Sequence, residues 1–291
     1  MAELQTQGIS LHYELLGDRS KPPILLLAGL GGAGSSFGPQ IERFAANYFV
    51  VLPDHRGTGR STRAADGYTI AQHAADMAAL VRYLDLGPMH VIGTSTGGAI
   101  AQLMALDHAD TVRSVTMASS FARADAYMQR QFALRRKLMA EADAHTIYSC
   151  YALFLFAPHY ASQHADAVAA WIDRAAAHPL EREIAVTRID MIMAHDATAR
   201  LGAIRQPVLC VGGDHDLCTP FYLSQEIAQA IPGAQLEVVP GGGHFIHYEQ
   251  QDRFFAIIRD FIERLPASTT ASAAAAAGTL TRDNCMVATF R

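Results

Sequence analysis

The chain has 291 residues, of which 50% are hydrophobic and 18% are charged, and its formal net charge is −5 at pH 7. This length fits one large domain or two small ones, and the hydrophobic content is sufficient for a substantial buried core. The acidic balance leaves no general basic surface for a phosphate backbone, so we expect no nucleic-acid partner.

No segment of the sequence is typical of secretion or membrane insertion. The stretch MAELQTQGISLHYELLGD lacks the basic and apolar regions of a secretory signal. The apolar run YALFLFA is far shorter than the roughly 20 residues that a spanning helix requires. Widely spaced cysteines without a C-x-x-C pattern favour free thiols and a cytoplasmic location; they are Cys150, Cys210, Cys218 and Cys285. The histidines show no recognised ligand spacing, so we expect no metal site.

Hydrophobic periodicity predicts a chain that alternates between strands and helices. The predicted strands lie at residues 9–17, 23–29, 49–54, 89–95, 112–119, 207–213 and 235–241, and all but the first have the apolar pattern of buried strands. The predicted helices between and after them include residues 69–87, 97–110 and 248–265. Repeated strand–helix–strand units form a mostly parallel sheet with helices on both faces, so we expect an α/β fold.

The alternation stops after Ser120 and resumes only at the sequence IRQPVLCVGGD. The residues between them carry apolar stripes at helical spacing and little strand chemistry. We therefore expect a core of residues 1–120 and 197–265 with an inserted helical cap at residues 121–196. Residues 266–291 are low in complexity, and we expect them to be disordered.

A glycine-rich turn follows the predicted strand at residues 23–29. Residues 29–34 read G-L-G-G-A-G, which matches the G-x-G-x-x-G pattern of a dinucleotide-binding turn. Asp54 closes the next apolar run, where an acid that binds ribose is expected. These features raise the hypothesis that the chain binds NAD.

A second glycine-flanked motif lies at the junction of an apolar strand and a helix. Residues 93–97 read G-T-S-T-G, the pattern of a nucleophile elbow with Ser95 at its tip. A tight strand-to-helix turn crowds the residues two before and two after the serine, so these positions require glycine. The following helix directs its positive end at Ser95, where negative charge would develop. Ser95 is therefore the candidate nucleophile.

A serine nucleophile requires a general base and an acid that orients the base. On a scaffold of this kind the acid and then the histidine follow the serine along the chain. The strand end CVGGDHDLCTP offers Asp214 or Asp216 as the acid. The glycine-rich loop VVPGGGHFIHYE offers His244 or His247 as the base.

In combination, these motifs are specific. The segments GLGGAGSSF, DHRGTGRS, GTSTGG, GDHDLCTP and GGGHFIHYE resemble the α/β-hydrolase family, and the resemblance extends from the first strand to DFIERL. It implies the α/β-hydrolase fold, with a mostly parallel sheet of the eight-stranded type. The aspartate of the family's G-x-x-D-x-x-x-P motif corresponds to Asp216 and is the expected acid. The base of its glycine-glycine-histidine loop corresponds to His244.

The same resemblance implies that the glycine run at residues 29–34 is an oxyanion loop. The backbone N–H groups of Leu30 and Thr96 would then donate to the oxyanion. Ala28 stands where the family usually has histidine. This departure leaves the two donors in place, because both belong to the backbone.

The NAD hypothesis is the weaker interpretation of this glycine run. It explains one turn and one acid, and it leaves the serine, aspartate and histidine of the triad as coincidences. We therefore expect no cofactor. Asp54 and Arg56 are expected to brace the loop beneath the elbow.

Within the family, the sequence is most similar to the branch of 3-oxoadipate enol-lactonases and aminoacrylate-type hydrolases. The similarity lies in residues 29–62, in YTIAQHAADM and in the cap run LFLFAPHYAS. It implies a serine hydrolase that cleaves a small ester or lactone through an acyl-serine intermediate. Thr94 and Thr96 flank the nucleophile where enol-lactonases more often have histidine or methionine, which counts against a lactone.

Candidate substrate-binding residues come from the oxyanion loop and the cap. They are Gly29, Tyr151, Phe154 and Phe156. Tyr148 belongs to the same aromatic run, and packing between cap helices explains each of these four aromatic residues equally well. The basic run at 135–137 and Arg123 or Arg130 are candidates to bind a substrate carboxylate, although a solvated helix face explains them better.

Other activities remain open on this scaffold. A carbon–carbon bond hydrolase or an amide hydrolase would use the same triad. A cofactor-free oxygenase or a perhydrolase would use the serine elbow without hydrolysis, and a small-molecule receptor would bind without turnover. Ester turnover, reaction with serine-directed reagents and oxygen consumption distinguish these classes.

Overall fold

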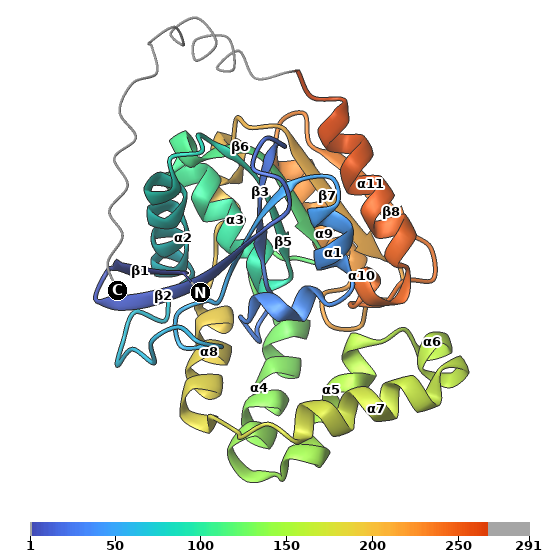
Figure 1. The fold of residues 1–291 in the computed structure, drawn as a ribbon. Helices are drawn as coiled ribbons and strands as arrows, with labels where there is room; N and C mark the ends of the chain where they lie inside the picture. Colours follow the sequence, from blue (N-terminus) through green and yellow to red (C-terminus); the bar gives the residue numbers. More distant parts are fainter. Residues whose placement is uncertain (1, 267–291) are drawn as a thin grey trace, which may run out of the picture.

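The structure, a computed structural model, describes residues 2–266 and is built on one eight-stranded sheet (Figure 1). Its strands are β1 (Ala2–Thr6), β2 (Ile9–Leu16), β3 (Pro23–Leu27), β4 (Phe49–Pro53), β5 (Met89–Thr94), β6 (Val112–Ala118), β7 (Val208–Gly213) and β8 (Gln235–Val239). They lie in the order β1-β2-β4-β3-β5-β6-β7-β8. The pairs β1–β2 and β2–β4 are antiparallel and the other neighbours are parallel, which confirms the expected α/β sheet.

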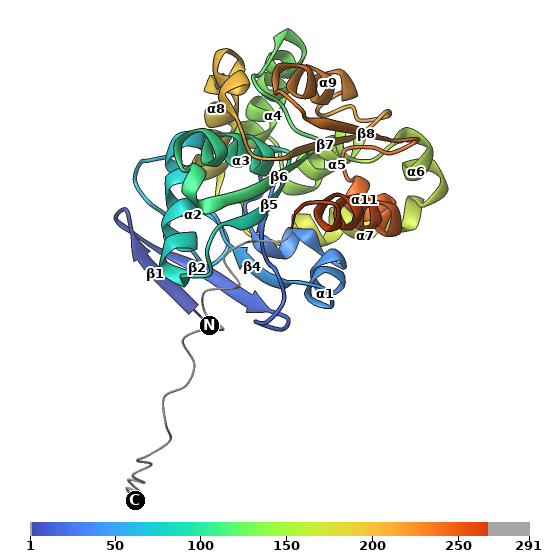
Figure 2. The ribbon, with the colours of Figure 1, turned by 90° about the horizontal axis from the view of Figure 1, so that it is seen from above.

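Helices cover both faces of the sheet (Figures 1 and 2). One face buries side chains of α1 (Gln40–Ala45) and α11 (Gln251–Glu263), including Phe44, Phe254 and Phe261. The other face buries apolar side chains of α2 (Ile70–Leu84), α3 (Thr96–Asp107) and α9 (Phe221–Ala230). The two hydrophobic clusters bury each strand of the central sheet on both sides, as parallel strands require.

Helix α2 begins and ends where its backbone groups find partners. The Thr69 hydroxyl accepts a hydrogen bond from the N–H of Gln72 at 3.0 Å and caps the first turn. Asp85 adopts a left-handed conformation with φ of 50° and ends the helix. The helix therefore stops slightly before Gly87, where the sequence pattern placed its end.

Strand β8 differs from the expectation of a buried strand. Its first four residues are exposed and only Val239 is buried. The strand is the last in the sheet order, so it has a neighbour on one edge only. The prediction of a buried strand, which rested on its two adjacent valines, was therefore wrong for most of its residues.

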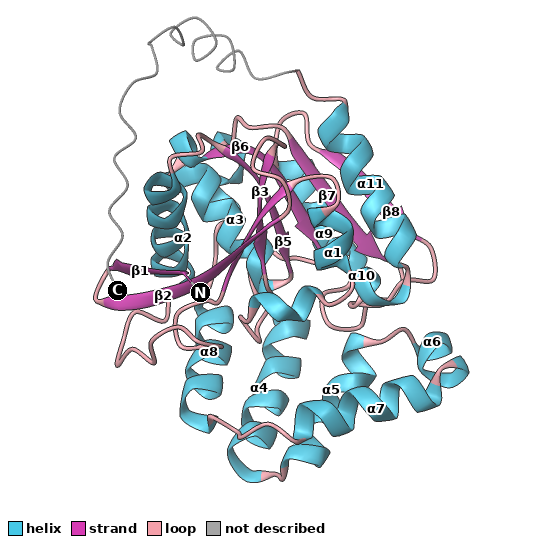
Figure 3. Cartoon of the chain, in the orientation of Figure 1, coloured by secondary structure: helices cyan, strands magenta, loops and turns pink. Residues whose placement is uncertain are grey.

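Residues 126–194 form five helices that lie over the carboxyl ends of the parallel strands, with loops but no strand between them (Figures 1 and 3). They are α4 (Ala126–Glu141), α5 (Ala144–Leu155), α6 (Pro158–Gln163), α7 (Ala165–Ala176) and α8 (Arg182–Ala194). Asp125 and Asp143 cap α4 and α5 by accepting backbone hydrogen bonds. An isolated bridge pairs Arg123 with Asp196, so the chain enters and leaves this helical layer at one place.

Several expectations concern the chain as a whole. No helix within residues 2–266 is long and apolar enough to cross a membrane. In the same residues, no group of three or more potential metal ligands is close enough to hold an ion. Cys150, Cys210 and Cys218 are free thiols. Cys285 and the tail expected to be disordered lie outside the described residues, except for Pro266.

Candidate active site

Ser95 occupies a sharp turn between β5 and α3. Its backbone has φ of 54° and ψ of −118°, a conformation that costs free energy in any residue other than glycine. A Cβ atom added to Gly93 would lie 2.2 Å from the carbonyl oxygen of Gly97, and one added to Gly97 would lie 2.1 Å from that of Leu27. Both glycines of the motif are therefore required by contacts between backbone segments.

The surrounding backbone holds this strained turn in place. The N–H of Ser95 donates to the carbonyl of Ala118 at 2.8 Å, and the Ser120 hydroxyl donates to the carbonyl of Ser95 at 2.8 Å. Thr96 is the first residue of α3, so its N–H has no partner within the helix. The turn thus presents the serine together with the positive end of a helix.

Asp216 and His244 form a buried pair. Nδ1 of His244 lies 2.9 Å from Oδ2 of Asp216, and the other carboxylate oxygen accepts from the N–H groups of Cys218 and Thr219, each at 2.8 Å. Burial by itself would lower the pKa of His244, but the Asp216 carboxylate and the neighbouring Cys218 together outweigh it and raise the pKa above the ordinary value. Because Nδ1–H donates to the carboxylate, Nε2 is left to accept a proton.

Glycines bring the acid loop and the histidine loop into contact. A Cβ atom added to Gly213 would lie 2.0 Å from the carbonyl oxygen of Gly242. The alternative acid, Asp214, is exposed and accepts from the N–H of Gly241. Asp216, not Asp214, is thus the acid that reaches His244.

His247, the alternative base, also borders the cavity but is packed among aromatic rings. Its ring is buried and packs 6.0 Å from that of Phe37 and 5.9 Å from that of Phe254. Burial lowers the pKa of His247 to about 4. Its ring has no carboxylate partner among the hydrogen bonds of residues 2–266, in contrast to His244.

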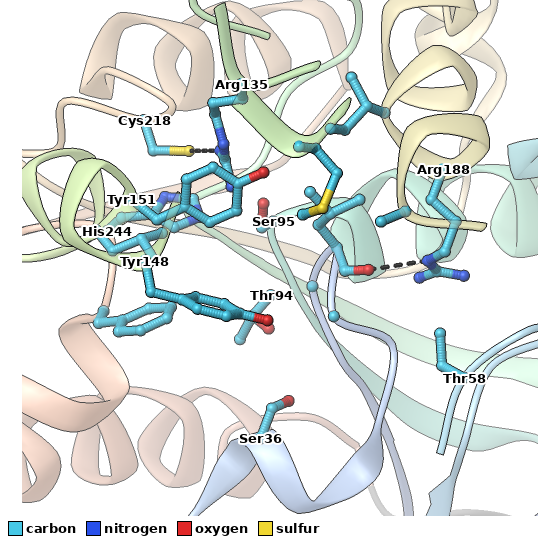
Figure 4. A pocket seen from close by; sticks show the side chains of 18 of the residues that line it. Ser36, Thr58, Thr94, Ser95, Arg135, Tyr148, Tyr151, Arg188, Cys218 and His244 are labelled. Carbon is cyan, nitrogen blue, oxygen red and sulfur yellow. Dashed lines mark hydrogen bonds between the residues drawn. The ribbon is translucent and has the colours of Figure 1, made fainter. Parts of the chain in front are cut away.

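Ser95 and His244 line the same cavity, which has a volume of about 510 Å³ and lies between the sheet and the overlying helices (Figure 4). This volume is in the range of sites for small molecules. The core contributes the loop of Gly29 and Leu30. The helical layer contributes Phe132, Arg135, Tyr148, Tyr151, Trp171 and Arg188.

Comparison with known proteins identifies the family. A family model described as the alpha/beta hydrolase fold matches residues 22–251. The chain belongs to the α/β-hydrolase family. This assignment confirms the resemblance and the fold that the sequence motifs indicated.

Individual relatives of this hydrolase carry different names. A protein of Azorhizobium caulinodans named "Putative carbamate hydrolase RutD" is 33% identical over 251 residues, which are 86% of this chain and 94% of that protein. The crystal structure of the enol-lactonase from Burkholderia xenovorans has a TM-score of 0.82 and 26% identity, and it covers 90% of this chain and 100% of its own. A structure from Mycobacterium tuberculosis titled "Putative non-heme bromoperoxidase BpoC" has a TM-score of 0.79 and 28% identity, covering 88% of this chain and 97% of its own.

In this α/β-hydrolase, the predicted oxyanion loop runs beside the nucleophile. A Cβ atom added to Gly29 would lie 3.4 Å from Cβ of Ser95. A tight turn follows, in which the N–H of Gly32 donates to the carbonyl of Gly29 at 3.0 Å. Leu30 lines the same cavity as Ser95, and its N–H stays the predicted donor to the oxyanion.

The aromatic candidates in the cap divide into two groups. Tyr151 lines the cavity together with Tyr148 and Leu155, which share one face of α5. Phe154 lies off that face and outside the cavity wall. Phe156 is also outside the wall and packs against other aromatic rings, so the structure favours the packing interpretation for both phenylalanines.

Asp54 and Arg56 are engaged in the loop beneath the elbow. Asp54 accepts from the N–H groups of Gly34 and Arg60, each at 2.9 Å. Arg56 forms a buried ion pair with Asp76 at 2.9 Å. Both side chains thus brace the loop, as the sequence analysis predicts.

Sequence reasoning missed Arg188 and gave Arg135 little weight. Arg188 lines the cavity from α8, and Arg135 lines it from α4, whereas Arg123 and Arg130 are exposed. A signal was present, because each of the two cavity arginines occupies the apolar stripe of its helix. An arginine at a core-facing helical position is rare unless a partner or a ligand meets it.

Proposed function

We propose that this chain is a serine hydrolase that cleaves a small carboxylic ester or lactone through an acyl-serine intermediate. The observation that carries the proposal is that Ser95, on its strained elbow, lines the same cavity as a histidine paired with a buried aspartate. Such a grouping activates a hydroxyl that is otherwise a weak nucleophile.

In the proposed reaction, Oγ of Ser95 attacks the substrate carbonyl carbon while Nε2 of His244 takes the hydroxyl proton. The N–H groups of Leu30 and Thr96 donate to the resulting oxyanion, and each such donor stabilises the transition state by about 2.7–4 kcal/mol. His244 then gives its proton to the departing alkoxide, and the carbon–oxygen bond to the leaving group breaks.

The second half of the reaction frees the enzyme. Water attacks the acyl carbon as His244 accepts one of its protons. The bond to Ser95 breaks, the serine oxygen regains that proton, and the carboxylic acid product leaves. Asp216 holds the imidazole in the required tautomer throughout and stabilises its cationic form.

A carbamate is the second candidate substrate class. The similarity to relatives named as carbamate hydrolases, at 33% identity over most of both chains, favours it. The same residues would form a carbamoyl-serine intermediate and expel the leaving group from the carbonyl carbon. We place this activity in the cytoplasm. The wide spacing of the cysteines favours free thiols, which persist in a reducing compartment.

The decisive experiment is intact-mass spectrometry after exposure to a small fluorophosphonate, on the wild type and Ser95→Ala in parallel. We expect one adduct in the wild type, mapped to Ser95, and none in the variant. A folded wild type without an adduct would contradict the proposal and direct attention to oxygen consumption or binding without turnover. A subsequent panel of short esters, lactones and carbamates would rank the substrate classes.

A further inference from the structure

Two histidines face each other across the seam between the helical layer and the core. His159 is on α6, at the outer end of the helical layer (Figure 1), and His215 is on the loop after β7, directly before Asp216. Their Nδ1 atoms are 3.3 Å apart, and both residues are exposed to solvent. Because the two histidines are 56 positions apart in the sequence, no ligand spacing indicates the pair.

The surrounding backbone sets the position of each ring. The N–H of His215 donates to the carbonyl of Gly242 at 2.9 Å, which holds this residue against the histidine loop. The ring of His159 lies over Gly241, where an added Cβ atom would be 3.3 Å from Cε1 and 3.4 Å from Nε2 of the ring. The Cε1–Nε2 edge of His159 is thus occupied by this contact, and its other nitrogen, Nδ1, faces His215.

The spacing of the two Nδ1 atoms fits a shared metal ion. Zn²⁺ binds imidazole nitrogens at about 2.0–2.1 Å with tetrahedral angles, which places two such nitrogens about 3.3 Å apart. The ring centroids would then be about 5.2 Å apart, whereas a straight N–H···N hydrogen bond of the observed length would place them about 5.6 Å apart. The observed centroids are 5.3 Å apart, with 79° between the ring planes. This is the arrangement expected if the two lone pairs converge on one point.

The surroundings of the pair are acidic. The Asp214 carboxylate accepts from the N–H of Gly241, over which the His159 ring lies. Glu249 accepts from the N–H of Ala157, two residues before His159, and interacts electrostatically with the His159 ring. Within residues 2–266, neither carboxylate forms an ion pair with a lysine or an arginine. The resulting negative potential favours a cation at this seam.

We propose that His159 and His215 bind a divalent transition-metal ion such as Zn²⁺ through their Nδ1 atoms. No third ligand side chain joins them in the part of the chain that the structure describes, so water fills the other coordination positions. Imidazole nitrogen suits this class of ion, whereas Mg²⁺ and Ca²⁺ prefer oxygen ligands. The bound ion fastens α6 to the loop that carries Asp216. The site goes beyond the proposed function, because it does not involve Ser95.

Calorimetric titration of ZnCl₂ into the whole chain tests the site. We expect the tightest equivalent of Zn²⁺ to bind His159→Ala and His215→Ala about 100-fold more weakly than the wild type, because a second ligand already in place makes its own binding intramolecular. The matched control is His178→Ala, which removes an exposed cap histidine outside the pair and should bind Zn²⁺ as the wild type does. Wild-type affinity in either His159→Ala or His215→Ala would overturn the site.

The double variant distinguishes one shared ion from two separate ones. Combining His159→Ala with His215→Ala should weaken Zn²⁺ binding no further than either substitution alone, because a single ion needs both rings. Losses that add in the double variant would mean that each histidine binds its own ion, and would overturn the shared site. Ser95→Ala should bind Zn²⁺ as the wild type does, so a failure of the serine mechanism leaves this test intact.

Hydrogen exchange tests whether the ion fastens the two layers. Saturating Zn²⁺ should slow amide exchange in α6 of the wild type about tenfold or more, because opening of this seam would have to release the ion. The same addition should leave α6 of His159→Ala unchanged, and Mg²⁺ should have no effect on the wild type. Unchanged exchange in α6 of the Zn²⁺-bound wild type, or equal slowing by Mg²⁺, would overturn the bridge.

Discussion

The two walls of the cavity are built in different ways. On the core side, backbone contacts fix the reacting groups, since Gly93 and Gly97 leave no room for even one added carbon beside Ser95. On the cap side, long side chains such as Tyr151 and Arg188 form the wall. A wall of backbone tolerates almost no substitution, whereas a wall of side chains changes one residue at a time. We infer that the core determines the reaction and the cap determines the substrate.

The largest effect is expected on the core side, at the nucleophile. Ser95→Ala should lower kcat by about 10⁴- to 10⁶-fold and leave the fold intact, because the acid and base alone provide no nucleophile. Steady-state kinetics with thermal unfolding checks both expectations. The matched control is Ser162→Ala, an exposed serine of α6. Turnover near the wild-type rate in Ser95→Ala would contradict the mechanism.

Asp216→Asn should lower kcat by about 10³- to 10⁴-fold. One carboxylate oxygen accepts from the N–H groups of Cys218 and Thr219, so the amide oxygen would take that place. The amide NH₂ would then face Nδ1 of His244 and impose the wrong tautomer.

The pH profile of the same variant provides a second measurement. The Asp216 carboxylate raises the pKa of His244, so in the wild type the neutral base forms only as the pH rises through that raised pKa. Loss of the carboxylate lowers the pKa, and the acidic limb of kcat/KM should move to lower pH. Asp214→Asn, at the exposed neighbouring acid, should change neither the rate nor the profile. Identical behaviour of the two variants would disprove the assignment of Asp216.

A smaller effect is expected from Gly97→Ala, which tests the rigidity of the core wall directly. The new Cβ would collide with the carbonyl oxygen of Leu27, so the elbow must shift. We expect kcat to fall by about 10²-fold from misplacement of Ser95, and stability to fall by about 1–3 kcal/mol. Gly202→Ala is the control, because its Cβ would have its nearest neighbour at an ordinary 3.6 Å. Full activity in Gly97→Ala would show that the wall is more tolerant than its contacts indicate.

The smallest effect is expected at Glu249, which joins the two walls. Its carboxylate accepts from the N–H of Ala157 in the cap at 2.9 Å and from that of Gly243 in the histidine loop at 2.8 Å. Glu249→Gln keeps only one of these acceptors, so we expect stability to fall by about 1–3 kcal/mol. The substitution should alter kcat a few-fold at most. Denaturant unfolding measures the change in stability, and steady-state kinetics measures kcat. A loss of activity as large as that of Asp216→Asn would mean that this residue acts in the chemistry.

The contrast between the walls also explains what could be predicted from the sequence. The core wall depends on short motifs whose glycines are dictated by local sterics, so the position of Ser95 could be inferred before any fold was known. The residues alone left two acids and two histidines open, and the resemblance to the α/β-hydrolase family indicated Asp216 and His244. The sheet followed from the alternation of strands and helices. The apolar pattern predicted the burial of a strand less reliably where its place in the sheet decides that burial. Strand β8 lies at the edge of the sheet and is mostly exposed.

The cap wall could be predicted only in part. Periodicity identifies the apolar face of a helix but not the neighbour that this face meets. Phe156 therefore looked like a pocket residue, although it packs against the rings of Tyr160, Trp171 and Phe245. Arg188 went unnoticed because its contact with the Leu30 loop joins segments distant in the sequence.

The turn at Ser95 also links the onset of activity to the order in which the chain folds. Its N–H is held by Ala118 at the end of β6, and Gly97 packs against Leu27 at the end of β3. Parallel pairing between such distant segments is slow, because the entropy of closing the intervening loops is lost before the contacts form. During refolding, recovery of nucleophilic reactivity should therefore follow assembly of the central strands and lag behind the appearance of helical structure.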